Sequence, residues 1–286
     1  MEKIMYTKQD LINDLKKMGL KETDTVLVHS SYKSIAGDVG VDGGADTIVD
    51  AFIEYFGEKG LVVFPTMSWK MGWMINDKGE YRPPFDENLD GFYPYGSDYD
   101  VKTTPSTDLG IIPEIFRKRE GVVRSLSPTT SLAAYGKDAE EFCSGHEKCK
   151  TPYAIEGPWH RLYDRKAKIL FLGTTMSCNT LMHAIEEWAK VPDLFAPFVW
   201  KFTVTDYDGN TFPLEYQRHN PHHNWYFNKM EPEFLERGIA EKVKFGSADT
   251  HLVDGVKETD YMMDRLSETP MLFTIEYNEK ESQSKE

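Results

Sequence analysis

Short apolar runs and an amphipathic segment alternate along the first part of the chain. Residues 24–29 and 60–65 are dominated by Val, Leu and Phe, as expected for buried strands, whereas residues 47–55 repeat apolar side chains at helical spacing. The order strand, helix, strand favours parallel strands that are joined by a right-handed crossover. The pattern therefore predicts an α/β fold.

The same patterns predict elements over most of the remaining chain. Predicted helices cover residues 7–18, 110–118, 138–143 and 179–190, and predicted strands cover residues 131–135, 167–173, 200–207, 211–216, 242–248 and 272–275, with a hairpin turn at 208–209. No internal repeat and no low-complexity linker interrupts these elements. We therefore predict a single domain over residues 1–275 and a polar tail over residues 276–286.

Residues 67–107 follow neither pattern and are rich in Gly, Pro, Tyr, Trp and Asp. An irregular segment of this length inside a compact domain is usually a binding loop or a lid. We therefore expect this segment to contribute to a ligand site.

The charge balance limits the classes of partner. The chain has 286 residues, with 47 acidic and 33 basic side chains and a formal net charge of −14. Nucleic acid requires a basic surface, so we expect no nucleic-acid partner. A negative cleft would attract a small cationic substrate, although solubility alone would also account for the charge.

The cysteines and the apolar runs bear on location. Three cysteines without a C-x-x-C pair suit a reducing cytoplasm, and their spacing does not predict a zinc site. The first residues lack an apolar signal core, and no run approaches the roughly 18 apolar residues of a membrane span. We expect a cytoplasmic protein without a membrane partner.

The segment after the predicted strand 167–173 contains a histidine and two glutamates on one helical face. Asn179 or Thr180 can cap this helix. His183, Glu186 and Glu187 are spaced i, i+3 and i+4, at the edge of the sheet where open α/β folds keep their sites. A carboxylate that orients an imidazole makes a general base near pH 7. The alternative is a surface helix with ordinary charges.

Two other motifs combine hydroxyl side chains with a strand end or a cation. The strand 24–29 runs into Ser30 and Ser31, where backbone N–H groups and hydroxyls can hold a phosphate or an amide-rich ligand. In residues 124–131 an arginine fork, which suits phosphate, lies among several hydroxyl residues. The alternatives are a plain capped turn and a surface loop.

As an ordered set, these motifs resemble the aminoglycoside 3-N-acetyltransferase family, the antibiotic N-acetyltransferases. The motifs that carry the resemblance are His29-Ser30-Ser31 with Gly43-Gly44, Phe64-Pro65-Thr66, Thr104-Pro105-Ser106, and residues 109–114, 124–131, 172–175 and 179–187. The resemblance extends over residues 7–270. It implies a three-layer α/β/α sandwich with a mixed, largely parallel central sheet, acetyl-CoA as co-substrate, and the 3-amino group of a 2-deoxystreptamine aminoglycoside as acceptor, which would confer antibiotic resistance.

The resemblance and the residue types together suggest roles for individual side chains. The predicted catalytic residues are His183 as general base, Glu186 or Glu215 as its carboxylate partner, and Thr174 as an oxyanion donor. The predicted acetyl-CoA residues are His29, Ser30, Ser31, Ser34, Thr66, Thr104, Arg124 and Ser125, and the predicted acceptor residues are Trp69, Asp86, Asp98 and Asp108. Ser127, Thr130 and Gly157 depart from residues that are frequent in the family, which would alter contacts to CoA.

Several alternatives remain at this stage. The acceptor could be the amine of another metabolite, or the protein could be a non-catalytic CoA-binding homologue. We expect direct transfer in a ternary complex, with Cys178 as acyl carrier the rival mechanism. Residues 218–223 contain three histidines, but Pro221 breaks a helical face and no nearby carboxylate completes a ligand set, so we expect a substrate loop and no metal. The sequence also allows a homodimer.

Overall fold

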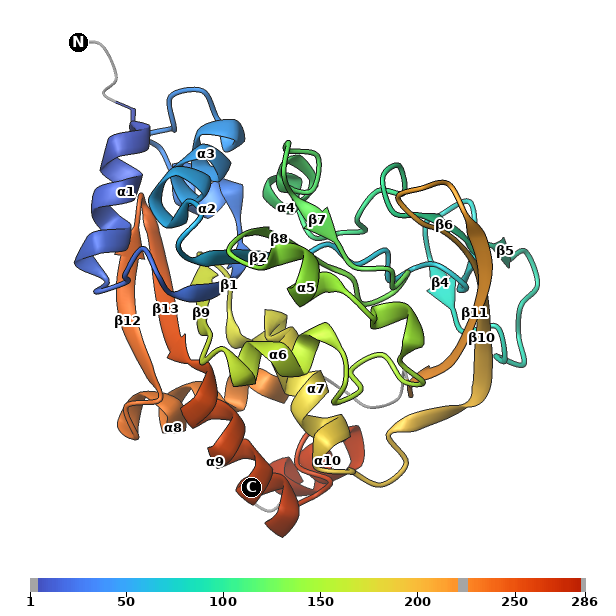
Figure 1. Cartoon of the computed structure of the whole chain (residues 1–286). Coiled ribbons are helices and arrows are strands. Elements are labelled where there is room, and N and C mark those ends of the chain that lie inside the picture. Colours follow the sequence, from blue (N-terminus) through green and yellow to red (C-terminus); the bar gives the residue numbers. More distant parts are fainter. Residues whose placement is uncertain (1–4, 221–225, 284–286) are drawn as a thin grey trace.

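A mixed sheet of seven strands forms the centre of the computed structural model, which describes residues 5–220 and 226–283. The strand order is β12-β13-β9-β1-β2-β8-β7 (Figure 1). β9, β1 and β2 pair in parallel, whereas the strands on both flanks pair antiparallel. The strands are β1 (Thr25–Ser30), β2 (Leu61–Pro65), β7 (Val123–Arg124), β8 (Leu132–Gly136), β9 (Lys168–Leu172), β12 (Ala240–Phe245) and β13 (Ala248–Asp254).

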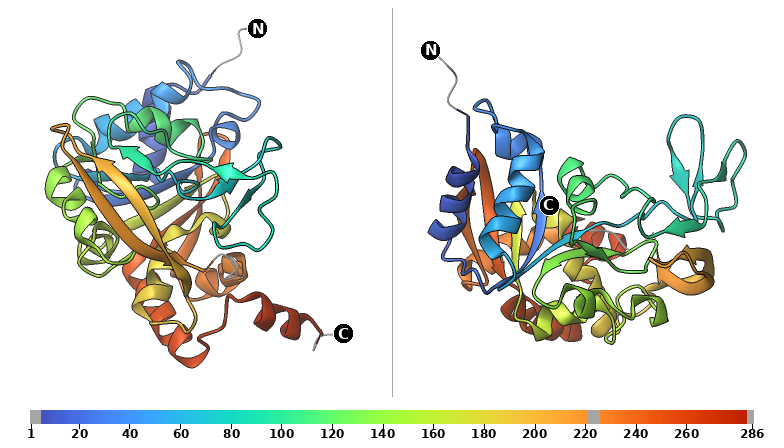
Figure 2. Two further views of the ribbon diagram at one scale, coloured as in Figure 1. Left: turned by 90° about the vertical axis from the view of Figure 1, so that its right-hand side faces the viewer. Right: turned by 45° about the horizontal axis from the view of Figure 1, so that its top comes forward.

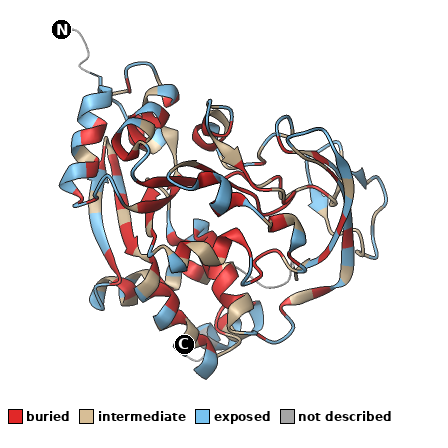
Figure 3. Ribbon diagram, viewed as in Figure 1, coloured by how far each residue is buried: buried red, intermediate tan, exposed pale blue. Residues whose placement is uncertain are grey.

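Helices cover both faces of this sheet, which confirms the predicted three-layer fold. Alternate residues of β1 point to opposite faces: Val26 and Val28 pack in one apolar cluster, and Leu27 packs in the other. The first cluster takes side chains from α1 (Lys8–Lys17), α2 (Tyr32–Ala36), α3 (Ala45–Phe56) and α4 (Ile111–Phe116). The second takes them from α5 (Ala139–Cys143), α6 (Pro158–Asp164), α7 (Thr180–Trp188), α8 (Glu231–Glu236) and α9 (Gly255–Glu268). Figure 3 shows the buried positions gathered where these layers meet.

A second, smaller sheet lies beyond the edge of the main one. It has the order β11-β10-β6, and a further small sheet has the order β4-β3-β5. The strands are β3 (Met74–Ile75), β4 (Tyr81–Arg82), β5 (Tyr93–Pro94), β6 (Asp98–Asp100), β10 (Phe195–Thr205) and β11 (Thr211–His219). Trp200 and Tyr99 anchor a separate apolar cluster there. In Figures 1 and 2 the β10–β11 hairpin stands beside the segment 67–107, on the side away from α1.

Two predicted strands need correction, and the first part of the polar tail is helical. Residues 242–248 are not one strand: β12 ends at Phe245, Gly246 turns the chain at φ 56°, and β13 begins at Ala248. Residues 272–275 form a turn that leads into α10 (Ile275–Gln283). The start of the predicted tail is therefore helical and partly packed, because the Asn278 amide donates to the backbone oxygen of Leu272 at 3.0 Å. None of the helices within residues 5–220 and 226–283 is long and apolar enough to span a bilayer.

Candidate functional site

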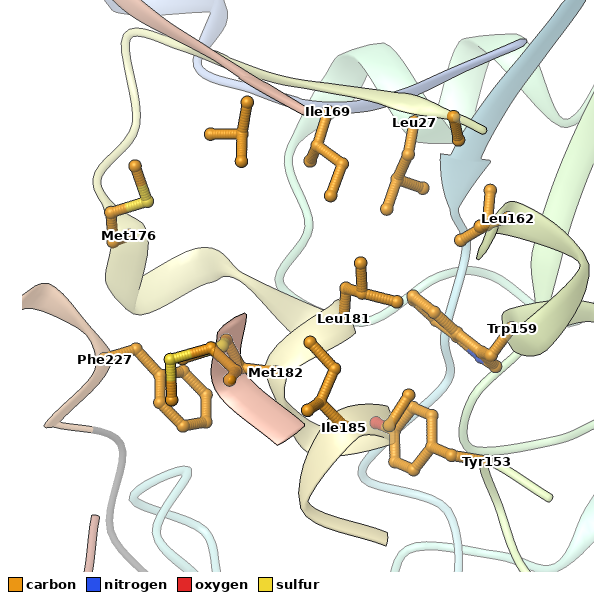
Figure 4. Packing of buried hydrophobic residues seen from close by; sticks show 14 of the residues in the cluster. Leu27, Tyr153, Trp159, Leu162, Ile169, Met176, Leu181, Met182, Ile185 and Phe227 are labelled. Carbon is orange, nitrogen blue, oxygen red and sulfur yellow. The ribbon is translucent and has the colours of Figure 1, made fainter. Parts of the chain in front are cut away.

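Helix α7 begins a few residues beyond the carboxyl end of β9. The chain leaves the strand at Gly173 and makes a short 3-10 turn (Met176–Cys178) before the helix. Leu181 and Ile185 bury one side of α7 against Ile169 and Trp159 (Figure 4). This packing fixes how the helix is rotated, and the His183 side chain keeps 21% of its surface exposed. The apolar spacing of the helix thus places its histidine at the surface of a site.

The start of α7 is held by a buried polar pair. Asn179 occupies the N-cap position but makes no side-chain cap bond; its amide donates to a carboxylate oxygen of Glu258 on α9. Glu258 is fully buried, and burial raises the pKa of its carboxyl to about 8. The prediction of an ordinary cap is therefore corrected: Asn179 ties the two helices together.

His183 and Glu186 form the pair that the i, i+3 spacing predicts. His183 Nδ1 lies 3.1 Å from Glu186 Oε2, and the Glu186 side chain is only 3% exposed. A carboxylate at Nδ1 favours the tautomer with its proton on Nδ1, which makes Nε2 the basic nitrogen. Phe227 packs edge-on against the imidazole at 4.8 Å between ring centroids, and Tyr153 lies on another side at 6.2 Å. The pair can accept a proton beside these two aromatic rings.

A second histidine–carboxylate pair lies beside the first. His219, at the end of β11, has Nε2 3.2 Å from Glu187 Oε2, and its ring centroid is 5.7 Å from that of His183. Glu187 also accepts hydrogen bonds from the Thr151 hydroxyl and the Tyr153 backbone N–H. Burial lowers the pKa of the His219 imidazole.

This second pair corrects the expectation that no carboxylate accompanies the histidines of residues 218–223. The carboxylate comes from α7, more than thirty residues away in the sequence, and the contact depends on the tertiary fold. His222 and His223 lie outside the described residues. Sequence reasoning also gave no role to Thr151 or Tyr153, because neither belongs to a recognisable motif.

Glu215, the other predicted partner of His183, is placed differently. It points to the opposite side of β11 from the buried neighbours Leu214 and Tyr216. Its carboxylate lies 3.2 Å from Lys201 Nζ, and its side chain is 52% exposed. The carboxylate that orients His183 is therefore Glu186.

Polar atoms without partners gather at the carboxyl ends of β1 and β9. Among the described residues, His29 Nε2, Ser30 Oγ and Thr174 Oγ1 are buried and make no hydrogen bond. β1 and β9 are adjacent, with Ser30 opposite Leu172. The His29 ring stacks on Phe171, and burial lowers its pKa to about 3, so it stays neutral.

These unpaired atoms fit the predicted use of acetyl-CoA. A buried polar atom without a partner costs free energy unless a ligand or water completes its hydrogen bond. A thioester carbonyl and the amides of a pantetheine arm would supply such partners. Ser34 lies close to the end of β9, because a Cβ added at Gly173 would be only 2.3 Å from the Cβ of Ser34. The Ser34 hydroxyl lies 3.0 Å from the Ser31 hydroxyl.

Arg124 and Ser125, two other predicted CoA residues, are enclosed. The Arg124 guanidinium donates to the backbone oxygens of Thr66 and Thr104 and to the hydroxyls of Ser68 and Ser131. Only 2% of its surface is exposed. A phosphate would have to displace these bonds, so the surroundings favour a structural role, and direct contact with CoA stays a prediction.

Ser125, Thr66 and Thr104 belong to the same internal network. The Ser125 hydroxyl is 2.8 Å from His146 Nδ1, and Thr66 is fully buried. The Thr104 hydroxyl accepts from the Asp100 backbone N–H at 2.8 Å. Their predicted contacts with CoA are untested, and each now has an internal partner.

The predicted acceptor residues fall into two groups. Trp69 and Asp108 are brought together by Lys70, whose Nζ lies 2.8 Å from Asp108 Oδ2 and 5.5 Å from the Trp69 ring. Asp86 instead pairs with Arg82 at 3.5 Å, and Asp98 is exposed on β6. The geometry thus joins one aromatic residue and one carboxylate, and both are already in contact with a cation.

Two of the three cysteines are buried and one is exposed. Cys143 and Cys149 are buried, which raises the pKa of each thiol to about 12. Cys178 is exposed rather than packed at the start of α7.

Comparisons with known proteins agree with this fold. The family model for aminoglycoside 3-N-acetyltransferase matches residues 27–267. A Bacillus subtilis protein, the SPbeta prophage-derived aminoglycoside N(3')-acetyltransferase-like protein YokD, is 33% identical over 68% of this chain and 70% of its own length. Its crystal structure superposes with a TM-score of 0.75 over 94% of this chain and 98% of that one.

Two further proteins, with lower sequence identity, are also similar to this chain. Aminoglycoside N(3)-acetyltransferase VII of Streptomyces paromomycinus is 26% identical over 89% of each chain. A structure described as AAC-IIIb binary with CoASH has 25% identity and a TM-score of 0.75, covering 92% of this chain and 96% of its own.

Proposed function

Because the chain belongs to the aminoglycoside 3-N-acetyltransferase family, an acyltransferase family, we propose that it transfers the acetyl group of acetyl-CoA to the 3-amino group of a 2-deoxystreptamine aminoglycoside. The observation that carries this proposal is the His183–Glu186 pair, in which His183 Nδ1 lies 3.1 Å from Glu186 Oε2. The activity would confer resistance to the antibiotic that is modified.

The reaction needs a neutral amine, and His183 supplies the base. Aminoglycoside amines are mostly protonated near neutral pH, so a proton must leave before or during attack on the thioester. His183 Nε2 accepts this proton, while Glu186 at Nδ1 stabilises the imidazolium that forms. As the C–N bond forms, the C–S bond of the thioester breaks, and the proton passes to the leaving thiolate, so that CoA departs as a thiol. A base of this kind contributes on the order of 10²–10⁴-fold to the rate.

The strand ends hold the donor in this scheme. Acetyl-CoA supplies the activated acyl group, and His29, Ser30, Ser31 and Ser34 lie where its pantetheine arm would pass. Thr174 Oγ1, buried and without a partner among the described residues, is the proposed hydrogen-bond donor to the developing oxyanion. Transfer is direct, and Cys178 takes no part as an acyl carrier.

The acceptor binds on the side of the β10–β11 hairpin and the segment 67–107. Trp69 and Asp108 offer a ring face and a carboxylate to a cationic sugar, which must displace Lys70 from Asp108. Asp86 and Asp98 add negative charge on the same segment. The net charge of −14 favours the approach of such a cation.

The test is thiol release from acetyl-CoA in the presence of gentamicin, tobramycin, kanamycin and neomycin, followed by NMR of the product. We expect turnover with at least one antibiotic and acetylation at the 3-amino group. Acetylation of another amine would disprove the regiochemistry. Absence of turnover with the whole panel, with CoA binding retained, would favour another metabolite amine as acceptor.

A further inference from the structure

The two histidine–carboxylate pairs bring together more donor atoms than proton transfer requires. His183, Glu186 and His219 each offer one nitrogen or oxygen, and these three atoms lie within 4.8 Å of one another. They come from α7 and from the end of β11. We propose that these three side chains form a binding site for a divalent transition-metal ion, with Zn²⁺ the representative ion, and that its occupation inhibits the enzyme.

The donor set suits such an ion. Two imidazole nitrogens and one carboxylate oxygen are typical ligands of Zn²⁺, with a fourth position left for water or another small molecule. Tetrahedral ligands at about 2.0–2.1 Å from zinc lie about 3.3 Å from one another. The present spacing of up to 4.8 Å therefore requires side-chain movements of the order of an ångström, without a change of backbone.

The surroundings of His219 resemble those of a metal ligand. Metal-binding histidines usually donate their second ring N–H to a carboxylate, which fixes the ring and leaves the other nitrogen for the ion. His219 Nε2 has this arrangement with Glu187, which is itself held by Thr151 and Tyr153. Among the described residues, His219 Nδ1 is buried and has no hydrogen-bond partner.

Occupation of the site is incompatible with general-base catalysis. A metal that takes a lone pair of His183 competes with the proton of the substrate amine, and a metal bound to Glu186 weakens the contact that orients the imidazole. The inhibitory effect thus rests on the proposed function, whereas metal binding itself does not.

Metal binding is tested first, on full-length protein freed of metal with a chelator. Competition for Zn²⁺ with a chromophoric chelator gives the affinity, and the visible spectrum of the Co²⁺ form reports nitrogen and oxygen ligands. We expect one tight site, weakened at least about 10-fold by His219→Gln, because loss of even an outer partner of a ligand typically costs about 10–100-fold.

Three controls separate this site from other ligands. His251→Gln removes a histidine whose Nε2 lies 3.1 Å from Glu231 Oε1 but which belongs to no candidate metal-binding group of the described residues. Cys178→Ser removes the exposed thiol. His222→Gln combined with His223→Gln removes the two histidines that follow His219 in the sequence and lie outside the described residues. Each control should keep the affinity of the wild type. Circular dichroism shows whether His219→Gln is folded, and His183→Asn replaces it if it is not.

The outcomes are distinct. Equal Zn²⁺ affinity in wild type, His219→Gln and His183→Asn would overturn the proposal, as would loss of the site in any control. If the protein acetylates an aminoglycoside, turnover should fall as Zn²⁺ binds and return with a chelator. Turnover that is unchanged at full occupancy would overturn the inhibitory role, and failure of the acetylation assay leaves the binding result unaffected.

Discussion

Two groups of buried polar side chains lie near the carboxyl ends of the central strands, and they differ in whether their hydrogen bonds are complete. Around Arg124, beside the end of β2, each guanidinium nitrogen has an acceptor within the protein. At the ends of β1 and β9, Ser30 Oγ and Thr174 Oγ1 have no partner in the described part of the chain. The sequence predicts contact with CoA for both Arg124 and Ser30, and the role of oxyanion donor for Thr174.

This difference distinguishes side chains that hold the fold together from side chains that can bind a ligand. A satisfied buried network holds segments together and offers nothing to a ligand, whereas unsatisfied groups carry a cost that a ligand can remove. We therefore assign Arg124 to joining residues 66, 104 and 131, and we keep the strand ends as the proposed binding site. The following predictions test this division.

The largest expected effect is on stability. Arg124→Met should remove the donor that the Thr104 backbone oxygen has from the guanidinium, and one of the two donors of the buried Thr66 backbone oxygen, which keeps its bond from the Ser131 hydroxyl. Hydrogen bonds to a charged group contribute about 1.5–3 kcal/mol each, so the loss of both should lower the free energy of unfolding by at least about 3 kcal/mol. Urea denaturation measures this loss. The control is Arg119→Met, which removes a half-buried arginine paired with Asp46 and Asp50 and should cost about 1 kcal/mol or less. Equal losses in the two variants would contradict the structural role.

The hydrogen bonding of Glu258 is intermediate between those of the two groups. Asn179 donates to one carboxylate oxygen, and the other oxygen has no partner among the described residues. Burial raises its pKa from 4.5 to about 8. Between these values the folded protein keeps a proton that the unfolded chain releases, so stability falls as pH rises, by up to about 1.4 kcal/mol per pH unit.

Urea denaturation of wild type and Glu258→Gln between pH 5 and about pH 8 tests this dependence. The neutral amide carries no charge at any pH, so we expect the variant to lose this part of the slope. Curves that stay parallel over the whole range would show that Glu258 does not titrate in this window.

The smallest expected effect is on affinity. Thr174→Val removes a hydroxyl without a partner, so stability should stay the same or rise slightly. The affinity for acetyl-CoA should fall about 5–10-fold, the equivalent of one hydrogen bond of about 1 kcal/mol. Thr175→Val is the matched control, because its hydroxyl already bonds that of Ser177 at 2.6 Å. Equal affinities by isothermal titration, together with an unchanged kcat, would remove Thr174 from the proposed site.

Local patterns predicted the parts of the molecule that depend on near neighbours in the sequence. The apolar runs of β1, β2 and β9 and the i, i+3 contact of His183 with Glu186 are of this kind. The predicted strand 242–248 was wrong because the chain turns at Gly246, with φ 56°, and Ala248 already belongs to the antiparallel partner of β12. The β12–β13 hairpin therefore appears only in the structure.

Contacts between distant segments could not be predicted. The pairing of His219 with Glu187 requires β11 to end beside α7, and no spacing in the sequence encodes that meeting. Likewise, the sequence shows Arg124 among hydroxyl residues but not that it is enclosed. Burial decides whether such a residue binds a ligand or its own chain, and burial is a property of the whole fold.

The central claim is that His183 accepts the proton of the substrate amine. The most direct measurement compares kcat of His183→Ala with that of His160→Ala at saturating acetyl-CoA and aminoglycoside. His160 is a suitable control because it also pairs with a carboxylate on a helix, at 3.2 Å from Asp164, and its ring packs on Trp188 rather than on the rings beside His183. We predict a fall of about 10²–10⁴-fold in kcat for His183→Ala alone, with CoA affinity retained. Equal values of kcat in the two variants would contradict the account.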